Sequence, residues 1–361
     1  MKTTQPLDVL FLHRKPRKNG TFSIEFIFQD IRSRLPESIF SRVLVSKYES
    51  NGIFKRLYNT LEAAFCKADV KHITGDVHYL ALFLRGKKTI LTIHDCFFLY
   101  KVSGFARWFH KKFWYDIPLK KCRYIVAITE ATKREILKLA DCDPNKIVVI
   151  PSLISSQFQP NPKPFNKQKP VILHVGLAPN KNIERLAEAL EGIPCHLSVL
   201  GKLEDWHIEM LEKHGIEYSC SYNISDNDVL AMYEACDMLA FASTYEGFGM
   251  PIVEANAVGR AVLTSNISSM PFVAGDAACL VDPFDVHSIQ QGLLKIINDD
   301  KYREQLIENG YVNRQRFDPD AIAVQYARLY FEVANRQPSD LKIHNVGRVQ
   351  NPAGVELQAI K

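Results

Sequence analysis

Two glutamates in the stretch TYEGFGMPIVEANAVG, residues 244–259, have the type and spacing to bind a sugar. Glu246 and Glu254 lie eight positions apart, and each carboxylate can accept hydrogen bonds from two neighbouring hydroxyls of a sugar ring. A simpler interpretation stays open for Glu254, because an acid near the start of a helix also stabilises the helix dipole.

The residues between the two glutamates suit a diphosphate. Gly247 and Gly249 let the backbone approach a ligand closely or adopt positive φ, and Pro251 fits the first turn of a helix. The N–H groups around Gly249 and Met250 then point out of a helix N-terminus, where anions bind. A nucleotide sugar presents sugar, diphosphate and ribose in this order, so the segment predicts a site for such a donor.

These residues need a strand that ends before them and a helix that follows. Apolar, β-branched runs that each end at a turn or a helix start recur along the chain, as in a parallel sheet covered on both faces. The predicted strands are 8–13, 42–45, 89–95, 124–129, 146–151, 170–176, 195–201, 237–243 and 260–265. Helices are predicted from 182, from 225 or 226, and over 251–259, 286–298 and 319–334. This alternation predicts an α/β fold of two doubly wound, Rossmann-like domains facing a central cleft that holds the ligands.

A proline-rich stretch divides the chain. Residues 155–170 contain four prolines and almost no periodicity, so we predict a linker at 156–170 between an N-terminal domain, 1–155, and a C-terminal domain, 171–315. The helix within 316–334 is predicted to pack back on the first domain. Residues 335–361 lose periodicity and are predicted to form a disordered tail.

The segment around the two glutamates resembles the signature of family-4 retaining glycosyltransferases of the GT-B fold. The resemblance extends over 222–283 and to HVGLAPNKN (174–182), TIHD (92–95) and YIVAITEATKREIL (124–137). It covers most of residues 80–330 and implies a mannosyltransferase-like enzyme of the bacterial polysaccharide type. In such an enzyme the first domain binds the acceptor and the second binds the nucleotide sugar.

The resemblance implies a role for several residues of the second domain. Glu246 would contact the hydroxyls of the transferred sugar near the reacting carbon, and Glu254 would bind the donor ribose. Lys181 would neutralise the diphosphate as it leaves, with Asn182 beside it in the donor site. In isolation, Lys181 would be a solvated lysine at a helix start, but a cation there opposes the helix dipole, which favours a functional role.

The first domain would contribute two residues and departs from the family at two points. His94 would reach across the cleft to the sugar, with Asp95 orienting its ring, although a lone strand histidine is more often a core residue. Gly20 would bring a backbone N–H near the phosphate, but its loop has one glycine where the family usually has two. The arginine that commonly precedes the phosphate lysine is also missing, and Arg14 or Arg17 is a candidate substitute.

The implied reaction is transfer of a hexose, from GDP-mannose or a UDP-sugar, to a hydroxyl of a glycan or polyprenyl-linked acceptor in surface polysaccharide synthesis. The resemblance implies retention of configuration. We expect no metal and no cofactor, because the lysine and the helix N-terminus can stabilise the leaving oxygens. Asp141 and Asp143 spell the metal-binding DxD pattern, but a turn rich in Asp, Pro and Asn explains them. No GxGxxG follows the first strand, which argues against NAD or FAD.

Composition and charge suggest where the protein works. No apolar run reaches the length of about eighteen residues that a transmembrane helix needs, and the N-terminus does not resemble a signal peptide. The eight cysteines are scattered without a CxxC pair, as expected of reduced thiols in the cytoplasm. The first 165 residues carry twice as many Lys and Arg as Asp and Glu, whereas the rest is net acidic. The basic half therefore predicts an anionic partner.

The stretch 103–124 is the candidate for membrane contact, because it mixes aromatic with basic residues. Phe105, Phe109 and Phe113 fall on one helical stripe. They either face the core of an ordinary amphipathic helix or rest on an anionic membrane that presents a lipid-linked acceptor. The second interpretation predicts a peripheral protein at the inner face of the cell membrane.

Two other functions fit parts of the sequence. One is a different GT-B enzyme, such as a nucleotide-sugar epimerase. The other is a non-enzymatic module that binds nucleic acid through the basic half. We expect no nucleic-acid partner, because the donor motifs lie in the acidic half.

Overall fold

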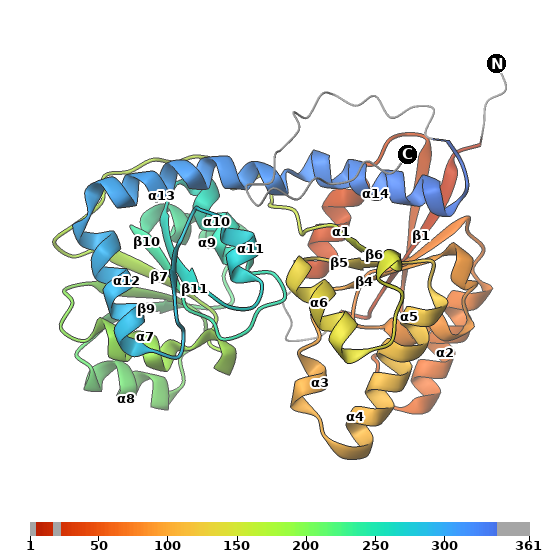
Figure 1. The fold of residues 1–361 in the computed structure, drawn as a ribbon, viewed down its shortest axis with the longest axis horizontal. Helices are drawn as coiled ribbons and strands as arrows, with labels where there is room; N and C mark the ends of the chain where they lie inside the picture. The colour runs from red at the N-terminus through yellow and green to blue at the C-terminus, as the bar shows by residue number, and fades with distance from the viewer. Residues whose placement is uncertain (1–4, 17–22, 338–361) are drawn as a thin grey trace. The chain divides into compact units, whose positions relative to one another are not determined.

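The computed structural model describes residues 5–16 and 23–337. They form two compact units, each built on a six-stranded parallel sheet (Figure 1). The first unit holds the chain up to Ser155 and again from Pro319, and the second holds Ser156–Asp318. The predicted α/β class with two doubly wound sheets is confirmed.

The sheet of the first unit has the order β2-β1-β3-β4-β5-β6, and every pair is parallel. Its strands are β1 (Leu7–His13), β2 (Ile39–Val45), β3 (Val70–Ile73), β4 (Thr89–Ile93), β5 (Tyr124–Ala127) and β6 (Ile147–Val149). Its α-helices are α1 (Ser23–Ser33), α2 (Ile53–Phe65), α3 (Phe98–Lys101), α4 (Gly104–His110), α5 (Ile117–Lys121), α6 (Glu130–Leu139) and α14 (Pro319–Val333). Shorter helical turns are η1 (His78–Phe83), η2 (Gly86–Lys88), the π-helical η3 (Lys111–Asp116) and η4 (Pro144–Lys146).

Both faces of this sheet are buried, as the apolar runs predict. In β1, Leu10 and Leu12 join the apolar cluster that also contains residues of α2, α5 and α6. The alternate residues Val9 and Phe11 pack instead with residues of α1 and α14. A strand with period-two side chains must be apolar throughout when helices cover both faces.

Helix α14 is part of the first unit although it ends the described chain. Its Tyr330 hydroxyl lies 2.8 Å from Nδ1 of the buried His72, whose Nε2 lies 2.7 Å from the Thr92 hydroxyl. Arg34 of the first unit also pairs with Asp320 at 2.8 Å. The part of the predicted tail beyond residue 337 lies outside the described residues.

The sheet of the second unit has the order β12-β11-β10-β7-β8-β9, again all parallel. Its strands are β7 (Val171–Val175), β8 (His196–Leu200), β9 (Glu217–Ser221), β10 (Met238–Phe241), β11 (Ala261–Ser265) and β12 (Cys279–Val281). Its α-helices are α7 (Ile183–Leu190), α8 (Asp205–Lys213), α9 (Asp226–Ala235), α10 (Met250–Val258), α11 (Met270–Ala274), α12 (Val286–Asn298) and α13 (Asp300–Asn313). The turns η5 (Pro179–Lys181) and η6 (Arg314–Phe317) complete it.

Three strands and several helices escaped prediction, each for a local reason. β3, β9 and β12 are short, and β9 is a largely exposed edge strand with the polar sequence EYSCS. Among the helices, α13 has weak amphipathic patterning despite its fourteen residues. Short or polar elements carry little periodicity, so only their neighbours in the folded sheet define them. Within residues 5–16 and 23–337, no helix combines the length and apolar character needed to cross a membrane.

Candidate functional site

Glu246, in the turn between β10 and α10, forms an ion pair with a lysine far away in the sequence. The Lys181 Nζ donates a hydrogen bond to Oε1 of Glu246 at 2.6 Å. The side chains are only 19% and 14% exposed, respectively. Because β7 and β10 are neighbours in the sheet, the turns that follow their carboxyl ends meet at one edge. Two predicted site residues, 65 positions apart, are therefore in direct contact.

The backbone on both sides of Glu246 is held by polar side chains. Asn180 Nδ2 donates to the Tyr245 carbonyl at 2.9 Å and to the Glu246 carboxylate at 3.3 Å. The Ser268 hydroxyl accepts from the Glu246 N–H at 3.2 Å and lies 2.8 Å from the Glu246 carbonyl. Ser269 donates to the Phe248 carbonyl at 2.7 Å. These contacts fix the carboxylate without covering it fully.

Helix α10 begins at a glycine in the left-handed region. Gly249 is the N-cap with φ 107° and ψ 52°, and no side chain caps the first turn. A Cβ there would lie 3.1 Å from Cδ1 of Ile252, so both backbone conformation and space favour glycine. Pro251 has no N–H, which leaves Gly249 and Met250 to offer theirs at the positive end of the helix dipole. The predicted position of Pro251 in the first turn is observed.

A second glycine makes room for the lysine. Gly176 follows β7 with φ +87°, and a Cβ there would lie 3.1 Å from Cε of Lys181. The ammonium group also lies 4.7 Å from the centre of the Phe241 ring. The lysine stem is thus packed while its charge stays at the edge of the sheet, beside Glu246.

Glu254 faces the same region from inside α10. The carboxylate Oε2 accepts a 2.5 Å hydrogen bond from the hydroxyl of Tyr233, a fully buried residue of α9. Burial raises the pKa of Glu254 to about 7, while the Tyr233 hydrogen bond and the charge of Lys181 oppose the rise. Near neutral pH the group can both accept and donate hydrogen bonds, as binding of vicinal hydroxyls requires. Phe158, in the segment before β7, packs edge-on against the Tyr233 ring at 5.5 Å.

Asn182 stabilises the loops around it through its side-chain hydrogen bonds. It is buried, sits in the left-handed conformation with φ 63°, and forms the N-cap of α7. Its Nδ2 donates to the carbonyls of Ala242 at 2.9 Å and Pro283 at 2.7 Å, and its Oδ1 accepts from Arg185 at 2.9 Å. These bonds tie together the loops after three strands, while its predicted contact with a donor stays a prediction.

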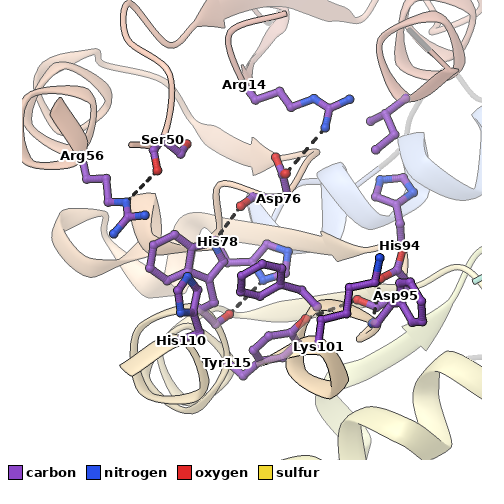
Figure 2. A pocket seen from close by; sticks show the side chains of 14 residues that line it. Arg14, Ser50, Arg56, Asp76, His78, His94, Asp95, Lys101, His110 and Tyr115 are labelled. Carbon is purple, nitrogen blue, oxygen red and sulfur yellow. Dashed lines mark hydrogen bonds and ion pairs between the residues drawn. The ribbon is translucent and has the colours of Figure 1, made fainter. Parts of the chain in front are cut away.

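In the first unit, the predicted site residue His94 (Figure 2) is held by a backbone carbonyl. His94 follows β4, and its Nε2 donates to the Thr74 carbonyl at 2.8 Å, while burial lowers the pKa of the imidazole. Thr74 therefore orients the ring in place of Asp95, whose carboxylate accepts from the Phe97 N–H at 2.9 Å. Gly20 and Arg17 lie outside the described residues.

The discounted acidic pattern behaves as a turn. Asp143 accepts from the Asn145 N–H at 2.9 Å, and Asp141 is exposed beside Lys120 at 3.1 Å. Across the described part of the chain, no three His, Cys, Asp or Glu residues gather in a way that could hold a metal ion.

Sequence reasoning missed the residues that support the site. Asn180, Ser268 and Tyr233 contact the two glutamates, and Gly176 gives Lys181 its place. Gly176 could have been predicted, because a glycine directly after a strand is a recognisable signal. Asn180, Ser268 and Tyr233 could not, because the sequence around a polar residue in a loop or helix does not indicate which residue it contacts.

Comparisons with known proteins cover nearly the whole chain. Residues 28–158 match the family described as Glycosyltransferase Family 4, and residues 155–313 match the family described as Glycosyl transferases group 1. O-antigen chain mannosyltransferase B of Escherichia coli is 28% identical over 235 residues, which are 59% of this chain and 61% of that protein. Serotype-specific mannosyltransferase WbdA of Escherichia coli is 24% identical over 353 residues, 83% of this chain and 42% of that protein. The chain thus spans less than two thirds of the length of these relatives.

Solved structures share the fold. The crystal structure of Anabaena HepE in complex with UDP and glucose has a TM-score of 0.72 at 16% identity and covers 90% of this chain and 100% of that one. WaaG, a glycosyltransferase of lipopolysaccharide biosynthesis, has a TM-score of 0.67 at 16% identity, with 90% and 99% covered. The fold is therefore shared by proteins that differ widely from this chain in sequence.

Proposed function

The chain belongs to the family-4 type glycosyltransferases of the GT-B fold, and on that basis we propose that it transfers a hexose from a nucleoside diphosphate sugar to a hydroxyl of a glycan. The observation that carries the proposal is the contact of Lys181 with Glu246 beside the start of α10. A cation, a hydroxyl-binding carboxylate and free backbone N–H groups there match the three chemical needs of such a donor.

The proposed chemistry follows from charge. As the bond from the anomeric carbon to the diphosphate oxygen breaks, negative charge grows on the leaving group. Lys181 and the N–H groups of Gly249 and Met250 would stabilise that charge in place. The acceptor oxygen forms the new bond on the face that the diphosphate leaves, and its proton passes to a phosphate oxygen. We propose retention of configuration and no metal on this basis.

For the donor we propose GDP-mannose, with a UDP-sugar as the alternative. Two relatives are named mannosyltransferases of O-antigen synthesis, whereas the HepE structure contains UDP and glucose. A surface polysaccharide or its lipid-linked precursor is the corresponding acceptor.

A donor screen tests the proposal directly. GDP-mannose, UDP-glucose and ADP-glucose would each be added at equal concentration in a thermal-shift assay, with and without EDTA. We expect one sugar nucleotide to raise the melting temperature selectively, because ligands that bind only the folded state stabilise it. NMR of the product should show the donor's anomeric configuration. No shift with any sugar nucleotide, or an inverted product, would contradict the proposal, and epimerised free donor would favour the epimerase alternative.

We also propose that the first unit contacts an anionic membrane at the cytoplasmic face. Helix α2 directs an apolar stripe outward, namely Ile53, Phe54, Leu57, Tyr58, Leu61 and Phe65, with Phe54 86% and Phe65 82% exposed. Its buried positions include Asn59, Thr60 and Ala63, so this helix has the reverse of the usual polarity. Lys47 Nζ lies 5.2 Å from the Tyr58 ring, which supplies a cation at the edge of the stripe.

The helix singled out from the sequence adds to this surface only in part. Phe105 is 76% exposed and stacks on Trp108 at 5.6 Å, whereas Phe109 and Phe113 pack against the core. Phe109 and Phe113 therefore follow the interpretation of a helix packed on the core, whereas membrane contact by the exposed Phe105 stays part of the proposal.

Vesicle sedimentation tests the membrane proposal. We expect the protein to pellet with vesicles of phosphatidylcholine and phosphatidylglycerol but not with phosphatidylcholine alone, and the F54S/F65S variant to stay in the supernatant. V312S changes an exposed apolar residue of the second unit and is the control. Equal sedimentation of F54S/F65S and wild type would refute a role for α2.

A further inference from the structure

The hydroxyl of Tyr233 forms a contact in the second unit that no pattern in the sequence predicted. It donates a 2.5 Å hydrogen bond to Oε2 of Glu254, a length at the short end for a hydroxyl and a carboxylate. Tyr233 is fully buried, so bulk water does not compete for this bond. Among residues 5–16 and 23–337, no other group forms a hydrogen bond or an ion pair with the Glu254 carboxylate. Oε1 is therefore left to accept from a ligand.

Packing fixes the direction in which the Tyr233 hydroxyl points. The ring of Phe158, a residue only 3% exposed, contacts the tyrosine ring edge-on, with the centroids 5.5 Å apart and the planes at 87°. A tyrosine side chain has only two rotatable bonds that move its ring. Because α9 also packs against α10, the hydroxyl reaches one point of α10 and holds the Glu254 carboxylate in one orientation.

Two ionisable groups act on the Glu254 carboxylate. Burial raises the pKa of Glu254 to about 7, and the hydrogen bond from Tyr233 and the charge of Lys181 both oppose the rise. Lys181, in turn η5, is itself paired with Glu246 at 2.6 Å. In the described parts of α11, α13, η6, β10 and β11, which also pack on α10, no charged side chain lies within ion-pair distance of Glu254. Tyr233 is thus the direct contact that favours the ionised form.

A purely structural role does not explain this pair. A buried carboxylate with one hydrogen bond and no counterion in contact destabilises a fold, and an apolar side chain of similar volume is better tolerated there. A buried tyrosine hydroxyl usually finds an acceptor, but a backbone carbonyl serves for this without bringing in a charge. The Tyr233–Glu254 pair therefore has a cost in stability that a ligand contact would justify.

We propose that Tyr233 is a positioning residue of the donor site, whose hydroxyl holds Glu254 ionised and oriented so that Oε1 accepts from the vicinal hydroxyls of the donor ribose. The inference rests on the proposed function, since the ribose belongs to the proposed donor. An ionised carboxylate accepts from both hydroxyls, whereas protonation removes one acceptor position. Donor affinity should therefore rise with pH as Glu254 ionises, and Tyr233 should set the pH at which this occurs.

Donor affinity as a function of pH, measured by calorimetry on the full chain, tests the inference. The probes are GDP-mannose and UDP-glucose, whose diphosphate diesters stay ionised between about pH 5.5 and pH 8.5, a range that spans the titration of Glu254. Each is compared with its 2′,3′-dideoxyribose analogue, which lacks the hydroxyls that Glu254 would bind. For the wild type we expect the affinity of the tighter probe to fall about tenfold from pH 8 to pH 6. The affinity of its analogue should stay nearly constant.

Matched variants assign this pH dependence to the pair. Y233F removes the hydroxyl and keeps the ring, and it should move the midpoint upward by about one pH unit or more, since a hydrogen bond to a charged group is worth that much. Y311F removes a hydroxyl that packs beside Gly259 at the other end of α10, and it should keep the wild-type midpoint. E254Q should abolish the pH dependence without altering Tyr233. In the E254Q background, Y233F should leave donor affinity unchanged, because a positioning residue acts only through its partner.

Four results overturn the inference while the proposed function stands, because each requires a donor that binds. They are a donor affinity of the wild type that does not depend on pH, a wild-type midpoint in Y233F, an equal shift in Y311F, and wild-type pH dependence in E254Q. An effect of Y233F that persists in the E254Q background also overturns it. Failure of both sugar nucleotides to bind the wild type at any pH would instead contradict the proposed function, and the inference with it.

Discussion

Replacing Lys181 by Met tests the central electrostatic argument, because it removes the charge and keeps most of the side-chain volume. Two unit charges about 4 Å apart interact by about 4 kcal/mol at an effective dielectric constant of about 20. This is an upper bound for the charge that develops on the leaving diphosphate. The lysine is 19% exposed, and we expect solvent screening to leave about half of it.

The full and the screened interaction energy set the range expected for the fall in kcat/KM. A loss of about 2 to 4 kcal/mol in transition-state stabilisation corresponds to roughly a 30- to 1000-fold fall in kcat/KM, at about 1.4 kcal/mol for each factor of ten. The assay is the initial rate of nucleoside diphosphate release with the donor that the thermal-shift screen selects. K213M, which removes an exposed lysine at the end of α8, is the control and should retain the wild-type rate.

Melting temperature and rate together separate the role of the Lys181 charge from a role in folding. A K181M variant with a wild-type melting temperature and less than about a threefold loss of rate would show that this lysine does not stabilise the leaving group. A large loss together with a fall in melting temperature would require K181R as well. If K181R restored folding and part of the rate, the charge itself would be the cause.

Three further predictions concern the same unit. Burial raises the pKa of Glu254 to about 7, from an ordinary value of 4.5. Folding therefore favours the protonated carboxyl, and its charge destabilises the fold as pH rises through this range. E254Q should raise the free energy of unfolding by about 1 to 3 kcal/mol at pH 8 and leave it unchanged at pH 4, measured by thermal unfolding; an equal effect at both pH values would contradict this. G176A places a Cβ 3.1 Å from Cε of Lys181 at φ +87°, so it should cost about 1 to 2 kcal/mol of stability and slow donor turnover; unchanged melting and turnover would show that the glycine is dispensable. N182A removes two hydrogen bonds to carbonyls and should cost about 2 to 4 kcal/mol in denaturant unfolding, whereas a loss confined to donor affinity would indicate direct donor contact instead.

Helix starts and turns were predicted correctly from the sequence where residues of a single segment determine them. Ser225 caps α9 by accepting from the Asp228 N–H, one of the two starts that the sequence allowed. Gly249 and Pro251 mark the turn and start of α10 as expected. Capping and positive φ depend on residues within one turn of one another, so they can be read from the sequence.

The residues that complete the site could not be read in this way. Tyr233 looks like any core residue of α9, yet its hydroxyl holds Glu254. The polar inner face of α2 is equally hidden, because a helix with a clear apolar stripe is normally assigned with that stripe inward. In both cases the partner comes from another element, and the pattern within the segment is the same whether that partner is present or not.

By itself the sequence determined the two α/β units, the strand–turn–helix that carries both glutamates, and the likeness to one enzyme family. The tertiary structure decided which of these residues meet. Lys181 contacts Glu246 because β7 and β10 lie side by side in the sheet order, and His94 is oriented by Thr74 because β3 and β4 are paired. Strand periodicity shows which side chains are buried but not which strand is the neighbour, since pairing is settled by the packing of the whole sheet and its helices.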